Sequence, residues 1–501
     1  MKFDDILSKL GEFGAYQKRL YLLLCIPAIS VGSFMMMLIV VMETPEHRCK
    51  IPGYENDTYA VQGHYHQGLI NVTIPKSTDL TKKYDQCHIY LYNDNYNDTE
   101  HNNENRTLTE CTEWVYEQTT FTETFTSKTN LVCKDALKTS HAQMIFYFGV
   151  LLGDFLFGVI ADWVGRKKSL YIALIILIAS SFAVAWIPNY VGFVILQFII
   201  GGTSHGAFVV CCVLGLELVG PTKRVWVGLV IQGFFATGLV YLAGIGYFVQ
   251  QWQYIDIAVA IPCIFYLPAI SGNRLLLIPE SPRWLISQGR RYEANNIIRK
   301  AAKVNKVVLP ENLIDSRTTE RSPQGQIWHL FTSKVFLMYY GVTMNSGNIG
   351  GNFFLNFFLF ACMEYPAYAI AIFFLDKVGR KKLHCACMIL ALYPLTLTLA
   401  LIGKLGASAA FGIIYVFSAE LFPTVVRNAG MGTSSCVARI GGMLAPYIAK
   451  SGSLVGGNFG KALPLVIFGA FSISAGLLCL LLPETLNQKL PDTLEEGRRF
   501  G

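Results

Sequence analysis

DWVGRKK at residues 162–168 recurs as DKVGRKK at residues 376–382. Two further segments repeat in the same order at a similar distance, about 200 residues apart. They are ELVGPTKR (217–224) with ELFPTVVR (420–427), and PES (279–281) with PET (483–485). Matched pairs in one order indicate that the chain consists of two related halves. Parallel repeats of this kind are typical of transporters that hold their substrate between the halves at mid-membrane.

The composition is that of a membrane protein. Of the 501 residues, 52% are hydrophobic and only 15% are charged, whereas soluble chains carry about 25% charged residues. The net charge is +7, but the basic residues are sorted into short loops, so we expect no nucleic-acid partner. We find no phosphate-binding loop, nucleophile–base pair or metal-ligand spacing. We therefore expect neither an enzyme nor a bound cofactor or metal, and a coupling ion, sodium or proton, stays undefined.

Apolar windows long enough to cross ~30 Å of hydrocarbon as a helix recur along the chain. A longer run, 383–417, must hold more than one helix, and the run 335–344 is only half a span. Together they predict an all-α membrane protein with about twelve transmembrane helices in two six-helix halves. The windows are 20–42, 143–161, 169–187, 191–213, 225–248, 255–278, 353–375, 429–448 and 462–482.

The polar segments between the windows predict the topology. The large loop after the first window carries four glycosylation sequons and four cysteines, both typical of an extracellular, oxidising face. The short opposite loops are rich in Lys and Arg, which places them and both termini in the cytosol. Four cysteines allow three disulfide pairings, and the sequence does not choose among them. The residues are Asn56, Asn71, Asn97 and Asn105, and Cys49, Cys87, Cys111 and Cys133.

These features divide the chain into seven segments. The first helix is interpreted as an uncleaved anchor, because its apolar core exceeds the roughly 7–15 residues of a signal peptide. We expect a multi-pass protein of the plasma-membrane bilayer that works as a monomer. The segments are a cytosolic N-terminus (1–19), helix one (20–42), an extracellular glycosylated disulfide loop (43–141), helices two to six (142–278), a cytosolic loop with short helices (279–334), helices seven to twelve (335–483) and a cytosolic C-terminus (484–501).

The repeated loop motif predicts a conformational gate. Its glycine permits a tight turn, and a carboxylate at a helix end can pair with a basic side chain in one conformation and release it in another. The alternative is that these charges only set the topology. The gate candidates are Asp162, Gly165 and Arg166, their repeats Asp376, Gly379 and Arg380, and Glu217 and Glu420, which we expect to pair with Arg224 or Arg427.

The combination of motifs resembles the major facilitator superfamily and, within it, the organic cation, carnitine and organic anion transporters, most of all the insect organic cation transporter-like proteins. The resemblance runs nearly end to end and includes the sequon-bearing loop. Sugar porters share PESPRWL but lack that large loop. The resemblance implies a carrier of small organic ions that works by alternating access. Its further motifs are PESPRWL (279–285), NSGN (345–348) and SAELFPTVVRN (418–428).

Charges inside the spans are candidates for substrate binding, because a buried charge is costly unless it faces water or a partner. In the resembling family, an arginine at the position of Arg439 is typical of anion and carnitine carriers, and a guanidinium can bind a carboxylate with two hydrogen bonds. The alternative is that an acidic neighbour neutralises it, such as Glu364. Glu364 is otherwise a counter-ion for a substrate cation or a helix-packing residue. Lys404 is either an anion ligand or a charge near the membrane edge, and Asp154 either attracts a cation or pairs with a polar neighbour.

The resemblance also implies a cavity wall with aromatic side chains, which favour quaternary ammonium groups through cation–π contact. His205 either lines this cavity or is a satisfied core histidine. We therefore expect organic cations or carnitine-like zwitterions as substrates, and an organic anion exchanger is the alternative. The wall residues are Phe208, Cys212, Gln232, Phe235, Tyr339, Tyr340 and Phe354.

The second half is shorter than the first. Asp162 and Glu217 stand 55 positions apart, whereas Asp376 and Glu420 stand only 44 apart. Eleven residues are about 16 Å of helix, most of a membrane crossing. The short run 335–344 is interpreted either as a helix broken at the following glycines (Gly347, Gly350 and Gly351) or as a gap in the sequence. If the shortening abolishes transport, the chain is a non-transporting membrane protein.

Overall fold

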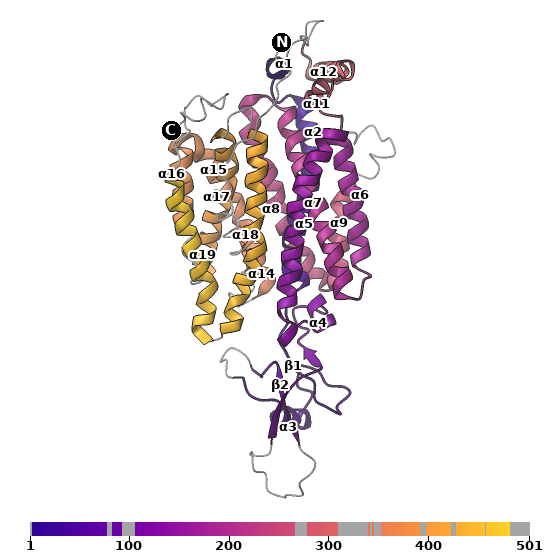
Figure 1. Cartoon of the computed structure of the whole chain (residues 1–501), viewed down its shortest axis with the longest axis vertical. Coiled ribbons are helices and arrows are strands. Elements are labelled where there is room, and N and C mark those ends of the chain that lie inside the picture. The colour runs from indigo at the N-terminus through magenta and orange to yellow at the C-terminus, as the bar shows by residue number, and fades with distance from the viewer. Residues whose placement is uncertain are drawn as a thin grey trace, which may run out of the picture.

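A computed structural model of the chain describes residues 3–77, 83–92, 106–265, 278–308, 339–340, 343–344, 352–390, 397–421, 427–455 and 457–480. Long helices run side by side through the body of the molecule, and a small sheet-bearing unit projects from one end (Figure 1). The helices of the first half lie on one side of the body and those of the second half on the other. The two halves are therefore separate layers with an interface between them.

The first half consists of nearly continuous apolar helices. Glycines let two of them touch through their backbones, since a Cβ atom on Gly153 would stand 2.1 Å from the carbonyl oxygen of Gly202. Small residues of this kind are the usual means by which membrane helices approach closely. The helices are α2 (Ala15–Val41), α5 (Leu137–Val164), α6 (Arg166–Val184), α7 (Tyr190–Leu218), α8 (Arg224–Val249) and α9 (Trp252–Ile264).

The second half combines short and long helices, from 10 residues in α14 to 29 in α18. The predicted run 383–417 divides into two helices, of which α16 has 11 residues, whereas α6, the helix after the equivalent motif, has 19. The three glycines proposed as a helix break lie outside the described residues. The helices are α14 (Phe353–Cys362), α15 (Glu364–Val378), α16 (Arg380–Leu390), α17 (Leu397–Leu421), α18 (Arg427–Val455) and α19 (Gly457–Cys479).

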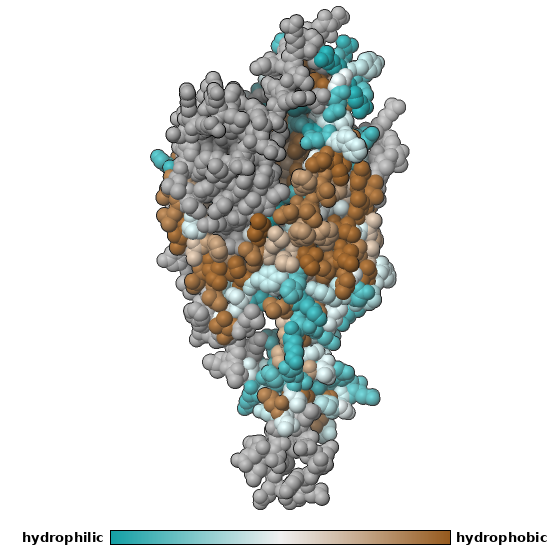
Figure 2. All heavy atoms as spheres, viewed as in Figure 1, coloured by the Kyte–Doolittle hydropathy of each residue, from teal (hydrophilic) through white to brown (hydrophobic). Residues whose placement is uncertain are grey.

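The outer surface of the helices suits a lipid environment. Within the described residues, six helices are long and apolar enough to cross a membrane. Large apolar side chains such as Phe155, Trp186 and Phe248 are 62–83% exposed. Figure 2 shows hydrophobic residues gathered around the middle of the body, with hydrophilic residues on the sheet-bearing unit and at the opposite end. Exposed apolar area on this scale indicates contact with lipid rather than water.

Short helices cover the end of the body opposite the sheets. They are α1 (Phe3–Lys9), α11 (Pro282–Ser287) and α12 (Arg291–Asn305), the last two within the segment where we expected short helices. Asn305 holds α12 to the start of α2, because its side chain accepts from the Tyr16 amide at 3.0 Å and donates to the Leu10 carbonyl at 3.0 Å. The N-terminus and the segment between the halves are thereby joined.

The segment after α2 folds into a small unit, which we call the cap domain (residues 43–136 without the gaps). It adds β-structure to the helical body. Strand β1 (His47–Cys49) pairs antiparallel with β4 (Trp114–Tyr116), and β2 (His88–Tyr92) with β3 (Arg106–Glu110). The remaining elements are α3 (His64–Thr73), α4 (Phe125–Thr129) and a 3-10 turn at Cys133–Asp135.

The structure selects one of the three possible disulfide pairings. Cys49 is bonded to Cys111, and Cys87 to Cys133. The first bond joins the end of β1 to the residue after β3, and the second joins the start of the β2 hairpin to the segment that leads into α5. Each bond therefore ties the hairpin of β2 and β3 to a part of the chain next to the membrane helices.

Two of the four predicted glycosylation sites can be placed. Asn56 and Asn71 are exposed on the cap domain, the second of them on α3. Asn97 and Asn105 lie outside the described residues. Glycosylation of any of the four stays a prediction.

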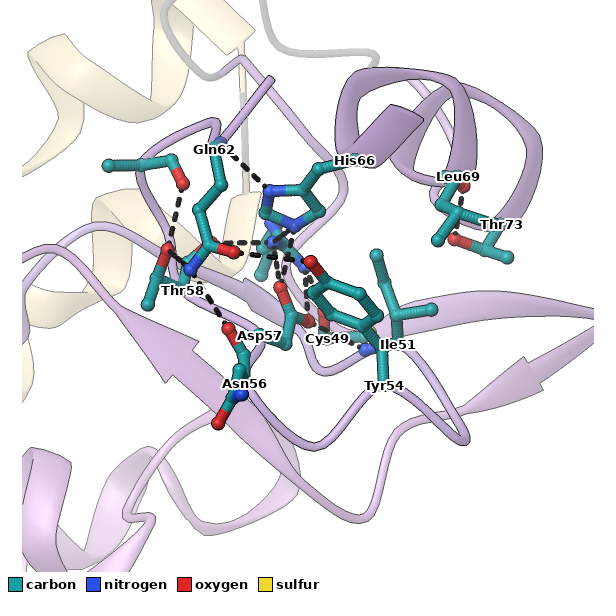
Figure 3. A network of polar contacts seen from close by, with 12 residues as sticks. Cys49, Ile51, Tyr54, Asn56, Asp57, Thr58, Gln62, His66, Leu69 and Thr73 are labelled. Atoms are coloured by element: carbon teal, nitrogen blue, oxygen red, sulfur yellow. Dashed lines mark hydrogen bonds and ion pairs between the residues drawn. The ribbon is translucent and has the colours of Figure 1, made fainter. Parts of the chain in front are cut away.

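A buried ion pair organises the cap domain (Figure 3). Arg48 and Asp57 both have fully buried side chains, and Arg48 Nη1 donates to Asp57 Oδ2 at 2.9 Å. The Ile51 amide and His66 Nε2 also contact this carboxylate, at 2.8 and 2.9 Å. Burial alone would raise the pKa of Asp57, but the hydrogen bonds from Arg48 and the Ile51 amide outweigh it and lower that pKa. The carboxylate is therefore ionised in the folded domain.

We predict that Asp57→Asn unfolds or loosens the cap domain, because it leaves the buried Arg48 guanidinium uncompensated, at a cost of about 3–5 kcal/mol. Protease accessibility of the cap domain on intact cells is the measurement. The exposed pair of Lys50 and Glu113 provides the matched control, since Glu113→Gln should leave the cleavage rate unchanged.

The same pair predicts a pH dependence with a definite sign. A carboxyl group with a lowered pKa in the folded state contributes stability above its ordinary titration range and loses it as the pH falls through the lowered value. Wild-type cap domain should thus become protease-sensitive only under acid conditions. Equal cleavage rates of wild type and Asp57→Asn at neutral pH would contradict this account.

Candidate functional site

Two groups of buried polar side chains lie at or near the interface of the halves. The first contains Asp154 on α5, His205 on α7, Arg439 on α18 and Tyr340, and we call it the cross-half cluster. Its three ionisable side chains are at most 6% exposed. Helices α5 and α18 pack against each other and run side by side in Figure 1. One cluster therefore draws its charges from both halves.

The glycine contact described above positions the first-half members of the cluster. Gly153 and Gly202 touch through their backbones, and Asp154 and His205 lie one and three residues further along the same two helices. Because the helices are so close, the short aspartate side chain reaches the imidazole. Its Oδ1 atom makes a short contact with His205 Nδ1.

Arg439 completes the cluster from the second half. Its Nε atom donates to Asp154 Oδ2 at 3.4 Å, and its Nη1 atom donates to the Tyr340 hydroxyl at 3.0 Å. Its Nη2 atom lies 2.7 Å from His205 Nε2. The Tyr147 ring stands 5.0 Å from that of Tyr340. The guanidinium is fully buried, and both its charge and three of its nitrogens are satisfied.

The second group lies within the second half, and we call it the inner cluster. Lys404 on α17 and Glu364 on α15 form an ion pair at 2.7 Å, with both side chains fully buried. Tyr339 and Tyr368 donate to the same carboxylate at 2.5 and 3.2 Å. The Lys404 ammonium donates to Thr343 Oγ1 at 2.9 Å and lies 3.8 Å from the centre of the Tyr339 ring. Adjacent tyrosines, 339 and 340, link the two clusters.

The structure differs from the sequence-based expectation in the acidic partner of Arg439. Glu364, an expected partner of Arg439, forms its ion pair with Lys404 instead. Asp154 takes the role at Arg439 instead. The Lys404 side chain is fully buried within the protein. The sequence could not show which acid pairs with Arg439, because each ion pair joins residues that are far apart in the chain and meet only in the folded protein.

The residues expected to form the aromatic cavity wall do not lie together: some adjoin the cross-half cluster, and Phe354 adjoins the cap domain. Phe208 stands 5.5 Å from His205 and 5.8 Å from Phe235, so these two rings adjoin the cross-half cluster. Phe354 instead packs against Phe121 of the cap domain, with centroids 5.1 Å apart. Gln232 is 7% exposed on α8, and Cys212, on α7, is half-buried.

An open pocket of about 320 Å³ lies between α8 and α15, where the halves adjoin. Its wall is mostly apolar, with Thr237, Tyr365 and Tyr368 as its polar members. Tyr365 donates to Thr237 at 2.9 Å across the interface. Since Tyr368 also contacts Glu364, the pocket reaches toward the inner cluster. Among the described residues, no group of His, Cys, Asp and Glu could hold a metal ion.

The gate motif of the first half forms a compact turn. Gly165 adopts φ +111°, which disfavours other residues, and Arg166 contacts Asp162 at 2.8 Å and Glu217 at 3.5 Å. Arg224 is half-buried at the start of α8. Sequence reasoning missed Glu280, whose carboxylate accepts from the Lys167 amide at 3.1 Å at the start of α6. Its only signal was its place in the repeated PES segment.

The second copy of the motif has the same backbone shape. Gly379 adopts φ +98°, and Arg380 donates to the Leu375 carbonyl at 3.2 Å, just as Arg166 donates to Ala161. The side chains of Asp376, Glu420 and Arg427 lie outside the described residues. The repeat found in the sequence is thus also a repeat of local structure at this turn.

Comparison with known proteins places these features in context. Residues 84–322 match the family model described as "Sugar (and other) transporter". The chain is 36% identical to the "Organic cation transporter protein" of Drosophila melanogaster, over 100% of this chain and 95% of the relative. It is 31% identical to "Organic cation/carnitine transporter 2" of Homo sapiens, over 99% of this chain and 94% of the relative.

Solved structures agree on the fold. The proton:xylose symporter XylE of the major facilitator superfamily, bound to 6-bromo-6-deoxy-D-glucose, superimposes with a TM-score of 0.61 at 16% identity, over 96% of this chain and 99% of that one. The predicted major facilitator fold is therefore confirmed. The alignment with the Drosophila protein extends over 545 positions, whereas this chain has 501 residues. The chain is accordingly shorter than this relative within the matched region.

For the inner cluster we predict a double-mutant cycle with strong coupling. Lys404→Met or Glu364→Gln alone should destabilise the protein by about 3–5 kcal/mol, because each leaves an uncompensated buried charge. The double variant should recover most of that loss. The measurement is thermal unfolding of the purified protein in detergent. Additive losses in the double variant would contradict the pairing.

Proposed function

Because the chain belongs to the organic cation and carnitine transporters of the major facilitator superfamily, we propose that its substrates are carnitine-like zwitterions and organic cations. The chain is a membrane transporter of small organic ions that works by alternating access, not an enzyme. We further propose that the cap domain is extracellular, both termini are cytosolic and one chain is the working unit.

The observation that carries the proposal on substrate is the charge balance of the cross-half cluster. Asp154 and Arg439 face each other with no excess of either sign, and both are buried. A zwitterion offers one carboxylate and one ammonium group, so it can replace both partners at once. Its carboxylate binds Arg439, and its ammonium group lies against Asp154. The exchange leaves no unpaired charge in a low-dielectric site, where such a charge is expensive.

Aromatic side chains around the cluster support an ammonium group of this kind. Tyr147 and Tyr340 stand next to Arg439, and Phe208 stands next to His205. A quaternary ammonium group cannot donate hydrogen bonds, so it gains most from aromatic faces and a nearby carboxylate. The cluster offers both kinds of partner within one site.

Contacts across the interface support a rocking mechanism in which the cap side is closed in this state. Lys450 on α18 donates to the Ala136 carbonyl at 2.5 Å and to Thr139 Oγ1 at 2.6 Å, at the start of α5. Phe121 of the cap domain packs against Phe353 and Phe354 of the second half. Opening toward the cap side requires these contacts to break, together with the bond between Asp154 and Arg439.

The charge balance argues against an organic anion exchanger. Both cations that would serve an anion, Arg439 and Lys404, already have buried carboxylate partners. A dianion would displace carboxylates without offering a cation in return. Dicarboxylate uptake is therefore the result that would favour this alternative.

We predict that cells expressing the chain take up labelled carnitine in a saturable manner and that Arg439→Gln impairs this uptake selectively. Loss of the charged hydrogen bonds to the substrate carboxylate should raise the half-saturating concentration roughly ten- to hundredfold. Uptake of tetraethylammonium, which has no carboxylate, should be retained, because Asp154 is still present. Arg439→Lys should be intermediate, since it keeps the charge but not the two-pronged geometry.

Several outcomes would contradict the proposal, provided that the surface amount of each variant is measured. Equal loss of both substrates in Arg439→Gln would mean that the residue does not bind a carboxylate. Uptake of a dicarboxylate but not of carnitine would identify an anion exchanger. Absence of all uptake in wild-type protein at the cell surface would mean that the shortened second half does not transport.

A further inference from the structure

We propose that Asp256 and Gln197 form a proton-binding site inside the first half, covered on the cap side by Phe125 of the cap domain. The ligand is one proton, held by a neutral Asp256 carboxyl group against the Gln197 amide. The site is separate from both clusters described above, since Gln197 stands eight residues before His205 on α7, or about 12 Å along the helix. The inference therefore goes beyond the proposed function and does not depend on the substrate.

The first observation is a buried acid without a hydrogen-bond partner. Asp256 on α9 is 0% exposed, and neither of its carboxyl oxygens has a hydrogen-bond partner in the described part of the chain. Gln197 on α7 faces this carboxyl group, is also 0% exposed and has both amide atoms unpaired there. The indole N–H of Trp252, one turn before Asp256, is unpaired as well. Buried polar groups are nearly always satisfied, so these groups indicate a ligand.

The second observation is that an ionised Asp256 would have no counter-ion among the described residues. Gln197 is the only side chain there that acts on its carboxyl group. Helices α2, α6 and α8 pack against α9, but their Lys and Arg residues lie in the first two turns, at the end of the body away from the cap domain. An isolated carboxylate is costly in such a place. A single bound proton removes the charge.

Ionisable groups on the neighbouring elements are engaged elsewhere. Tyr241 of α8 donates to the Ala258 carbonyl at 2.9 Å. Lys128 of α4 pairs with Glu123 at the surface, and His205 of α7 belongs to the cross-half cluster.

The Gln197 amide is the complementary partner of a neutral carboxyl group. A protonated carboxyl group has one O–H donor and a carbonyl acceptor, and a primary amide offers one of each in return. Two hydrogen bonds can then close a ring, from the Asp256 hydroxyl to Gln197 Oε1 and from Gln197 Nε2 to the Asp256 carbonyl oxygen. An ionised carboxylate only accepts, so it offers the amide oxygen no donor. One proton therefore pairs all four atoms.

Three aromatic rings cover this pair on the cap side. Phe193 stands one turn before Gln197 on α7, as Trp252 does before Asp256 on α9. Phe125, from α4 at the junction of the cap domain and the helices (Figure 1), stacks on Phe193 with ring centroids 3.8 Å apart. It meets Trp252 edge-on at 5.1 Å. All three rings are at most 2% exposed, so one cap-domain side chain separates the pair from the solution on that side.

The position of Phe125 and the proton are therefore coupled. With the ring in place the site is dry and favours the neutral acid. With the ring displaced, water can enter and solvate an ionised carboxylate. By reciprocity, a proton on Asp256 favours the conformation in which Phe125 covers the site.

The test is infrared difference spectroscopy of the purified full-length protein in detergent. At a pH of about 7 an ordinary aspartate is ionised, so the carbonyl stretching band of a protonated carboxyl group identifies the proposed state. Wild type should have this band, and Asp256→Asn, which keeps the shape of the side chain, should lose it. Glu113→Gln is the matched control at an exposed, ion-paired carboxylate and should leave the band unchanged.

Two further variants test the partner and the cover. Gln197→Leu should shift the band to higher frequency, because the Asp256 carbonyl loses the hydrogen bond from the amide. Phe125→Ala should weaken the band at the same pH, because water reaches the carboxyl group. Phe121→Ala is its control, since this cap-domain ring packs against Phe353 and Phe354 of the second half, and it should leave the band unchanged.

The absence of a band difference between wild type and Asp256→Asn would overturn the inference. A band that disappears when sodium replaces choline at constant pH would overturn it as well, because the site would then hold a metal ion. An unchanged band in Phe125→Ala would refute the coupling to the cap domain. If Asp256→Asn does not fold, an apolar carbodiimide, which reacts with neutral carboxyl groups, should modify Asp256 in wild type, and no adduct there would contradict the proposal. None of these readouts requires transport, so a failure of the proposed function is distinguishable from a failure of this inference.

Discussion

The ion pair between Arg439 and Asp154 is the interaction on which the arrangement of the two halves depends. An arginine buried in the middle of a membrane protein is tolerated only with a partner, and this partner belongs to the other half. The pair is possible because Gly153 and Gly202 bring α5 and α7 into backbone contact, which places Asp154 and His205 together. Helix packing in one half thus prepares the site that the other half completes.

The two clusters have different mechanical consequences. Glu364 and Lys404 join α15 to α17 within one half, so their bond need not break when the halves move. Arg439 joins the halves. Its bonds to Asp154 and His205 must therefore break in any state in which the halves separate at the cross-half cluster. In the proposed binding mode, substrate replaces those bonds and offsets the free-energy cost of breaking them. Binding and conformational change would then be coupled at this site.

Much of the fold could be predicted from the sequence, because apolar windows and repeated motifs can each be recognised within a short stretch of residues. The apolar windows and the motif turns at Gly165 and Gly379 follow from residues that are near one another in the chain, and the two halves follow from motifs that repeat about 200 residues apart. Arg439, Lys404 and Glu364 could be identified as candidate functional residues because burying a charge within a membrane span costs free energy. The family expected from the motifs is confirmed by the relatives.

The partners of those charges could not be predicted. Asp154 and Arg439 are 285 positions apart, and no local rule connects an acid on α5 with a base on α18. The disulfide pairing, Cys49 with Cys111 and Cys87 with Cys133, was likewise undetermined until the hairpin of the cap domain was known. The role of Glu280 depends on a turn that folds back onto α6. In each case the missing information was a long-range contact.

The most direct test of the central claim is an experimental structure of the protein with a bound carnitine-like zwitterion. Our account predicts that the Arg439 guanidinium has left Asp154 and binds the ligand carboxylate, with the ammonium group between Asp154 and the neighbouring aromatic rings. A ligand bound elsewhere, with the bond between Asp154 and Arg439 intact, would contradict it.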